Sequence, residues 1–272
     1  MLKNLKNECI IKFDLLTNGP LLIRDGKASE LDPTVPKIQF IKSIYNGELK
    51  PVMPGSSIKG VFRSRIERLL YNIDGCRCCD IFDREEGNNC KNNYKKFIQN
   101  EKLYPEIGKK LYTESCPACK MFGNLGLKGR VQFKDAFIED DKYKLGIRTN
   151  VGIDRITGAA VKGALFEPEV LEEGNFKCTI KIENYFKWQL KLLLYVLEEI
   201  NAGYVIFGAS TSRGFGNMKI DNFRIISKEF GICEDKFYSE KEFDLDQLKE
   251  ALKNVSINKT TLEEVELNGQ AI

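Results

Sequence analysis

The chain of 272 residues is 42% hydrophobic and 30% charged, which allows a substantial core and excludes an intrinsically disordered or collagen-like protein. It contains no histidine, so catalytic triads and imidazole acids or bases are excluded, and any enzymatic chemistry would fall to carboxylates, lysine or a metal ion. No apolar run approaches the ~18 residues of a membrane helix, and the first residues lack the apolar stretch of a signal peptide. We therefore expect a soluble, cytoplasmic protein with no membrane partner.

The charges are distributed unevenly along the chain. Lysine and arginine number 42 and aspartate and glutamate 39, which gives a net charge of +3. From residue 227 onward there are six lysines, no arginine and eleven acidic residues, a net charge of −5 that leaves +8 on residues 1–226. This asymmetry indicates a basic body that contacts a polyanion, although an ordinary solvated surface would explain the same numbers.

Hydrophobic periodicity and glycine or proline breaks divide the chain into strands and two amphipathic helices. The clearest helix begins at Pro54 with a serine that we expect to cap it, and the hairpin before it turns at Asn46-Gly47. The predicted elements are a strand at 6–17 that 18–23 extends or follows, a polar loop at 24–37, the hairpin at 38–53, the helix at 54–72, strands at 129–140 and 176–185, a helix at 187–201, a short buried strand at 204–208, a glycine-rich loop at 209–216 and a closing strand at 217–226.

The order of these elements indicates the fold class. A strand, a helix, strands, a second helix and a final strand are typical of the ferredoxin-like or RNA-recognition layer. We therefore predict an α+β fold of this kind that carries a zinc-bearing insertion and a long middle hairpin.

Six of the nine cysteines lie between positions 76 and 119. In a chain that we expect to be cytoplasmic, such clusters are more often metal ligands than disulfides. Cys116 and Cys119 have the two-residue spacing that lets two thiolates bind one tetrahedral ion. We predict that Cys79 and Cys90 complete a zinc site with them.

An all-sulfur site is closed, and it would therefore be structural rather than catalytic. Cys76 or Cys78 could replace Cys79 as a ligand, and a redox CxxC pair or buried free thiols are the other interpretations. Cys9 and Cys178 lie in apolar, strand-like segments, and we expect them in the core.

The entrance of the helix at 54–72 has the groups of an anion pocket. Free backbone N–H groups, the hydroxyls of Ser56 and Ser57 and the ammonium of Lys59 would suit a phosphate there. Arg63 follows one turn later on the same face. A well-capped surface helix is the simpler interpretation.

Two further segments combine basic residues with turn residues. In the glycine-rich loop, glycines surround Arg213 and either let a ligand approach the backbone or form a tight turn. A long middle segment carries Arg148, Arg155 and Lys162, followed by the apolar Phe166. As a projecting hairpin it could grip and unstack a nucleic acid strand, and a protein-contact loop is an equal alternative.

Four motifs together resemble one family. PGSSIKGVFRSRIE, SCPACKMFG, VGIDRITGAAVKGALFEPEVL and FGASTSRGFGNMKI, in this order, closely resemble the RAMP superfamily of CRISPR-associated proteins, best the repeated guide-RNA-binding backbone subunit of type III effector complexes. The resemblance covers roughly residues 8–226. It implies an RNA-binding domain at 1–226, with a cysteine-rich insertion at 74–122 and a thumb hairpin at 143–175, followed by an acidic extension at 227–272 outside the resemblance.

The resemblance also implies a chemistry and site residues. Family members cleave target RNA opposite each thumb, through a loop aspartate and magnesium or another divalent ion, and Asp32 matches that aspartate by position. Asp25 and Glu30 are alternatives, because the loop length leaves the alignment open. The implied RNA-binding residues are Ser56, Ser57, Lys59, Arg63 and Arg213 for the guide, and Arg148, Arg155 and Phe166 in the thumb.

The implied partners are a CRISPR guide RNA, a target RNA, other copies of the chain and other subunits of a type III complex. Two alternatives stay open. The chain could be a non-catalytic, architectural subunit, or it could be a stand-alone endoribonuclease that processes CRISPR RNA. Such processing enzymes commonly use histidine, which this chain lacks.

Overall fold

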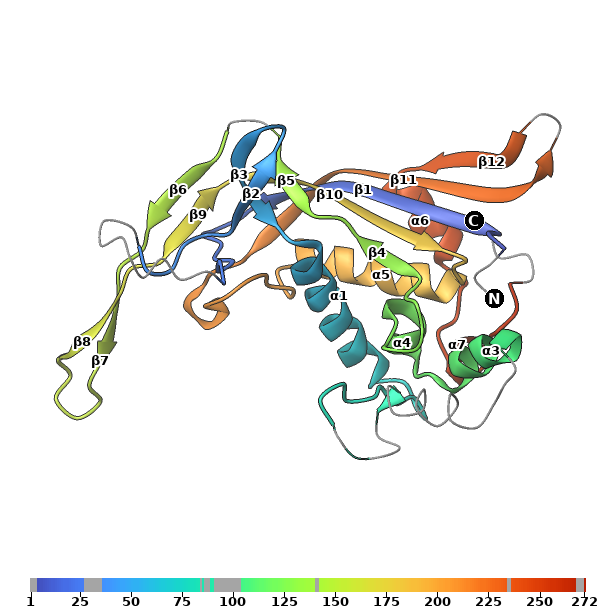
Figure 1. Cartoon of the computed structure of the whole chain (residues 1–272), viewed down its shortest axis with the longest axis horizontal. Coiled ribbons are helices and arrows are strands. Elements are labelled where there is room, and N and C mark those ends of the chain that lie inside the picture. The colour runs from blue at the N-terminus through green and yellow to red at the C-terminus, as the bar shows by residue number, and fades with distance from the viewer. Residues whose placement is uncertain are drawn as a thin grey trace.

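A large antiparallel sheet forms the centre of the molecule (Figure 1). The computed structural model describes residues 4–26, 36–83, 85, 89–90, 104–139, 142–233, 236–267 and 272. The strands of the sheet are β1 (Asn7–Thr17), β2 (Lys42–Tyr45), β3 (Glu48–Met53), β4 (Val131–Phe133), β5 (Ala136–Ile138), β10 (Asn175–Glu183), β11 (Met218–Cys233) and β12 (Lys236–Phe243). Their order is β12-β11-β1-β10-β5-β3-β2, and β4 also pairs with β10.

The predicted ferredoxin-like arrangement is confirmed. The helices among the described residues are α1 (Gly55–Leu70), α3 (Tyr104–Glu114), α4 (Pro117–Phe122), α5 (Lys187–Asn201), α6 (Leu245–Leu252) and α7 (Lys259–Leu262). In chain order β1, α1, β4, β10, α5 and β11 form the motif, and the strands lie side by side as β11-β1-β10-β4. Figure 1 shows α1 and α5 on one face of the sheet.

The core lies between this face of the sheet and the helices. Alternate residues of β1 point into it, among them Cys9 and Phe13, which are at most 2% exposed. Helix α1 contributes Phe62 and Ile66, four residues apart, because that spacing places both on one helical face. Burying such a side chain stabilises the fold by about 1.5–3 kcal/mol. Cys178 is also buried, as predicted for both strand cysteines.

Two predicted details at the start of α1 and in the following strand are wrong. The N-cap of α1 is Pro54, which makes no side-chain cap bond, and the serines lie inside the first turn. The strand expected at 129–140 is broken into β4 and β5 at Lys134-Asp135. The break allows Asp135 to accept a hydrogen bond from the N–H of Gly55 at 2.7 Å. Asp135 thus takes the place of the missing cap.

The predicted short strand at 204–208 is also absent. In this segment Ile206 forms only an isolated bridge with Asn217. Of the two alternatives for 18–23, the segment follows β1 after a bend at Asn18-Gly19, and Leu21 makes an isolated bridge with Leu171.

The long middle hairpin consists of two successive two-stranded sheets. Strands β6 (Lys144–Ile147) and β9 (Glu169–Glu173) form its base, and β7 (Asn150–Ile153) and β8 (Ala160–Phe166) form its outer part. Figure 1 shows β7 and β8 projecting from the body of the molecule. This hairpin occupies the segment that we expected to be a thumb.

The C-terminal segment packs on the same core. The boundary expected between residues 226 and 227 lies inside β11, which continues to Cys233 and pairs with β12. Leu248 and Leu262, from α6 and α7, are buried in the main core cluster. Across the described part of the chain, no helix combines the length and the apolarity that crossing a membrane requires.

Candidate functional site

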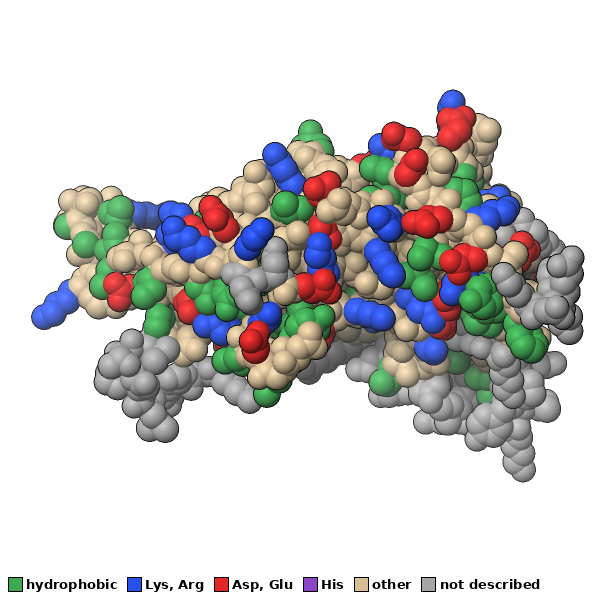
Figure 2. Space-filling model, turned by 90° about the horizontal axis from the view of Figure 1, so that it is seen from above, with side chains coloured by type: hydrophobic (Ala, Val, Ile, Leu, Met, Phe, Trp, Pro, Cys, Tyr) green, Lys and Arg blue, Asp and Glu red, His purple; other side chains and the backbone are tan. Residues whose placement is uncertain are grey.

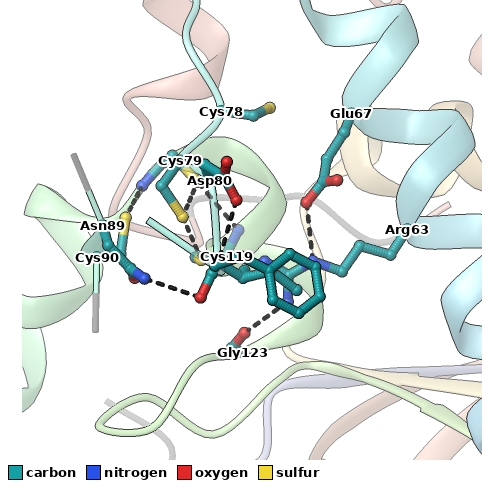
Figure 3. Close-up of polar contacts among 12 residues, drawn as sticks. Arg63, Glu67, Cys78, Cys79, Asp80, Asn89, Cys90, Cys119 and Gly123 are labelled. Atoms are coloured by element: carbon teal, nitrogen blue, oxygen red, sulfur yellow. Dashed lines mark hydrogen bonds and ion pairs between the residues drawn. The ribbon is translucent and has the colours of Figure 1, made fainter. Parts of the chain in front are cut away.

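Four cysteine sulfurs converge in one cluster, and Figure 3 shows three of these residues, Cys79, Cys90 and Cys119, beside α1. Cys79, Cys90, Cys116 and Cys119 lie with their sulfurs within 4.8 Å of one another. The Sγ of Cys79 is 3.5 Å from that of Cys119 and 3.8 Å from that of Cys116. Four sulfurs around a zinc ion, at about 2.3 Å from it, lie about 3.8 Å apart. The structure therefore brings together the four predicted ligands at spacings that suit a tetrahedral ion.

Local backbone geometry positions two of these sulfurs. Cys116 is the N-cap of α4, and its Sγ accepts a hydrogen bond from the N–H of Cys119 at 3.5 Å. The N–H of Cys116 in turn donates to the Sγ of Cys90 at 3.3 Å. Pro117 occupies the first helical turn, where its fixed φ suits the helix. The motif SCPACK thus forms a preorganised half of the site.

Cys76 and Cys78 do not belong to the group of four. Cys78 is 7% exposed and forms part of the hydrophobic core, and Cys76 packs against that core. In Figure 3 the sulfur of Cys78 lies apart from those of Cys79 and Cys119. The geometry therefore favours Cys79 over its two neighbours as the ligand.

Hydrogen bonds among the four thiols shift their pKa values, and a bound cation would shift them further. Hydrogen bonds from Cys119, then from Cys78 outside the group and from Cys79 and Cys90, lower the pKa of Cys116. Donating to Cys116 raises the pKa of Cys119, and the same contact raises that of Cys90. One thiolate is therefore stabilised by its neighbours, whereas ionising all four requires a positive ion among them.

Arg63 is directed toward this cluster. Its Nη2 donates to the Sγ of Cys119 at 3.5 Å, its Nη1 to the carbonyl of Gly123 at 3.2 Å and its Nε to Glu67 at 2.8 Å. Figure 3 shows the guanidinium between α1 and the cysteines. Arg63 thus connects α1 to α4, and its side chain does not point to the helix entrance where we expected a phosphate contact.

The helix entrance itself differs from the predicted anion pocket. The carboxylate of Asp135 already accepts from the N–H of Gly55, so an anion would compete with it there. Beside it lies an open groove of about 470 Å³, which we call the Lys59 groove. Its lining includes Gly55, Ser56, Lys59, Phe122, Lys128 and Gln132.

Two ammonium groups and two neutral hydrogen-bonding side chains therefore face the Lys59 groove. Burial and the positive charge of Arg63 lower the pKa of Lys59. An anion in the groove would stabilise the charged form of Lys59. The sequence did not predict Lys128 and Gln132 as site residues, because they lie about 70 residues from Lys59 and share no motif with it.

The glycines around Arg213 are needed for close packing within the protein. Gly216 donates to the carbonyl of Pro20 at 2.8 Å, and a Cβ on Gly216 would lie 1.8 Å from the carbonyl oxygen of Phe207. Gly208 has a positive φ of 76°, and a Cβ there would meet the carbonyl oxygen of Leu22 at 2.3 Å. Arg213 ends a short exposed turn, Thr211–Arg213, within this rigid loop.

The loop of the candidate aspartate starts and ends at the base of the long hairpin. Asp32 and Glu30 lie outside the described residues. Before the loop, Leu21 pairs with Leu171 of β9 through two backbone hydrogen bonds of 2.8 and 2.9 Å. After it, the N–H of Glu169 donates to the carbonyl of Ile38 at 2.8 Å. The described segments on both sides of residues 27–35 are therefore bonded to β9.

The predicted thumb residues lie on exposed parts of the long hairpin. Arg148 forms a two-bond ion pair with Glu172, both bonds at 2.8 Å, near the base. Arg155 lies in the exposed turn between β7 and β8, and Phe166 at the end of β8 is 47% exposed. Ile156 in the same turn is 95% exposed. The outer hairpin therefore presents two cations, Arg155 and Lys162, and several apolar side chains to solvent.

Asp154 holds the conformation of this turn. Its carboxylate accepts hydrogen bonds from the N–H groups of Ile156 at 2.7 Å and Thr157 at 2.9 Å. These backbone hydrogen bonds lower the pKa of Asp154, and the bond from Thr157 has the larger effect. The turn that displays Arg155 is therefore ordered by a local side-chain cap.

The open face of the sheet carries mixed charges (Figure 2). Lys177 pairs with Asp14 at 2.6 Å, and Lys181 pairs with Glu8 at 2.7 Å. Between these pairs, the outward residues of the central strands β1 and β10 include no aromatic side chain. These two strands thus offer no outward aromatic ring of the kind with which RNA-recognition sheets stack bases, whereas Phe137 of β5, the partner of Lys177, lies on the same face.

Comparisons with known proteins agree with this architecture. The family model of the RAMP superfamily matches residues 14–219. The CRISPR system Cms endoribonuclease Csm3 of Methanocaldococcus jannaschii is 27% identical over 209 residues, which cover 71% of this chain and 72% of that protein. Because the family match spans most of the chain, which also has the α+β sheet and helices described above, the chain belongs to the RAMP superfamily.

Proposed function

We propose that the chain is a backbone subunit of a type III CRISPR effector complex, which binds guide RNA and cleaves complementary target RNA. The relative named as a Csm3 endoribonuclease supports this assignment. The observation that carries it is that the described segments before and after residues 27–35 are hydrogen-bonded, at Leu21 and Ile38, to the base of the projecting hairpin. A loop carboxylate and a projecting hairpin that share one base can act on the same stretch of RNA.

The Lys59 groove and its surroundings would bind the guide backbone. Lys59 and Lys128 supply positive charge, and Ser56 and Gln132 supply hydrogen bonds to phosphate or ribose. Ser57, in the same first turn of α1, and Arg213, on the rigid glycine-rich loop, would add further contacts to the guide. Backbone contacts of this kind would make binding indifferent to base identity.

The long hairpin would act as the thumb on the RNA. Arg148 and Arg155 would contact phosphates, and Phe166 would pack against a displaced base. The exposed apolar side chains of the outer hairpin support this role, because inserting them between bases removes their surface from water. Other copies of the chain and other effector subunits would follow along the same guide.

Cleavage would use Asp32 with magnesium or another divalent ion, with Asp25 and Glu30 as the alternatives. Carboxylate oxygens are the ligands that magnesium prefers, and the ion supplies positive charge that stabilises the developing charge on the phosphate. In the reaction the ribose 2′-hydroxyl would give up its proton to solvent as its oxygen bonds to the adjacent phosphorus, the bond from phosphorus to the 5′-oxygen would break, and the 5′-oxygen would take up a proton from solvent. The chain orients the RNA for this attack through the groove and the thumb.

The cysteine cluster would hold structural zinc. All four donors are thiolates, which leaves no position for a substrate and matches the closed sites that stabilise folds. The cluster joins the segment after α1 to α4, and α4 ends at Phe122 in the wall of the Lys59 groove. Zinc would therefore support the guide-binding surface without contacting RNA.

Replacing Lys59 tests the guide-binding surface. For Lys59→Ala, the slope of log affinity against log salt should fall by about 0.7 for single-stranded RNA, because one phosphate contact and its released counterion are lost. Filter binding over a series of salt concentrations measures this slope. Lys241→Ala, which removes an exposed lysine of β12, is the matched control and should leave the slope unchanged. An unaltered slope for Lys59→Ala would remove Lys59 from the site.

A further inference from the structure

Helix α1 borders a second groove, of about 390 Å³, which we call the Tyr204 groove. Its volume lies within the range of about 300–1,000 Å³ that is usual for small-ligand sites. One wall is the middle and end of α1, and the other is the segment between α5 and β11. Its lining includes Gly60, Ser64, Arg65, Arg68, Tyr204 and Thr211.

An exposed aromatic ring stands in this groove. Tyr204 is 70% exposed, although its backbone is fixed by a hydrogen bond from its N–H to the carbonyl of Glu199 at 2.9 Å. Gly203 just before it has a φ of 78°, which ends α5 and turns the chain toward the groove. The ring is therefore held on a rigid turn with a face available for stacking.

The two arginines of the groove have different positions. Arg65 donates to both oxygens of Glu199, at 2.7 and 2.5 Å, and so ties α1 to α5 and neutralises that carboxylate. Arg68 is exposed and forms no ion pair with any residue that the structure describes. Because that carboxylate is already paired with Arg65, the described residues leave the positive charge of Arg68 without an anionic partner.

We propose that the Tyr204 groove binds one nucleotide of single-stranded RNA, with the base stacked on Tyr204 and a phosphate at Arg68. A fixed aromatic face beside a free cation is the combination with which proteins bind single strands without base preference. Thr211 lines the groove and begins the turn that carries Arg213, which we also propose as a guide-binding residue. The inference rests on the proposed RNA-binding function and names a further subsite within it.

The test measures the affinity of the whole chain for a short oligouridine by fluorescence anisotropy. Tyr204→Ala should weaken binding about tenfold, and Tyr204→Phe should bind like the wild type, because stacking needs the ring and not the hydroxyl. Arg68→Ala should lower the salt slope by about 0.7. Phe237→Ala, which removes an aromatic residue that is 80% exposed on β12, is the matched control and should have no effect.

A fluorescence readout tests stacking directly. The single tryptophan, Trp188, is 1% exposed, so Tyr204→Trp adds the one accessible indole. Its emission should be quenched when oligouridine binds, because a stacked base quenches indole fluorescence.

The outcomes separate this inference from the proposed function. If Lys59→Ala weakens binding but Tyr204→Ala does not, the subsite is overturned while the RNA-binding function stands. If the wild type binds no RNA, both are overturned. If Tyr204→Ala disrupts assembly with protein partners and leaves RNA affinity intact, the groove is a protein contact and the subsite is likewise overturned.

Discussion

Complexes that contain Asp32→Ala are expected to assemble and to bind target RNA normally but to cleave it about 100-fold more slowly or worse. A carboxylate that places a divalent ion does not hold the guide, so its loss leaves the binding surfaces unchanged. Stabilisation of transition-state charge by such an ion contributes several kcal/mol, and each ~1.4 kcal/mol corresponds to a tenfold change in rate. Single-turnover cleavage of a labelled target by the assembled complex measures the effect.

Asp25→Ala is the matched control for this experiment. Asp25 lies at the start of the same loop, and its N–H donates to the carbonyl of Gln39 at 3.0 Å. Chelating the divalent ion should reproduce the Asp32→Ala result in the wild type. Normal cleavage by Asp32→Ala together with slow cleavage by Asp25→Ala would transfer the catalytic role to Asp25. If neither variant altered the rate, the chain would be an architectural subunit.

Cys116→Ser is expected to lose zinc and much of the stability of the fold. Cys116 contacts the other three ligands of the group and also caps α4, so no neighbour can replace it. Metal-binding free energy at structural zinc sites is folding free energy, of about 10–16 kcal/mol in zinc-finger peptides. Elemental analysis of untagged protein should find one zinc per wild-type chain and less than half an equivalent in the variant, with a lower thermal unfolding temperature.

Cys76→Ser is the control for the ligand set. Cys76 lies in the same segment but outside the group of four, so this variant should retain its zinc. Loss of zinc from Cys76→Ser to the same extent as from Cys116→Ser would show that the ligand set is wrong. Substoichiometric zinc in gently purified wild type would reject the metal site itself.

Local patterns in the sequence were sufficient for the fold class and for the group of cysteines. The helical spacing of Phe62 and Ile66 and the Asn46-Gly47 turn are short-range signals, and the structure contains both the helix and the hairpin. Cys116 and Cys119 are also linked by local geometry, because the first turn of α4 brings the two sulfurs together. The helix, the hairpin turn and the two-cysteine motif depend mainly on contacts between residues that are close in the sequence.

Contacts between distant segments could not be predicted in this way. The carboxylate of Asp135 caps α1 from 80 residues away, and this contact divides a predicted strand in two. Arg63 follows the helical pattern of a surface residue, yet a loop about 60 residues later turns its guanidinium toward Cys119. The Tyr204 groove likewise forms only where α1 meets the segment after α5. Each depends on tertiary packing that no single motif encodes.

RNA that co-purifies with the protein from its native cell tests the central claim most directly. Gentle purification at low salt, followed by sequencing, should recover RNAs of defined length that join a CRISPR spacer to part of the repeat, because the chain is proposed to follow a guide along its backbone. These RNAs should include many different spacers, since the groove contacts are indifferent to base identity. Recovery of no RNA, or of random cellular fragments without CRISPR sequences, would contradict the account.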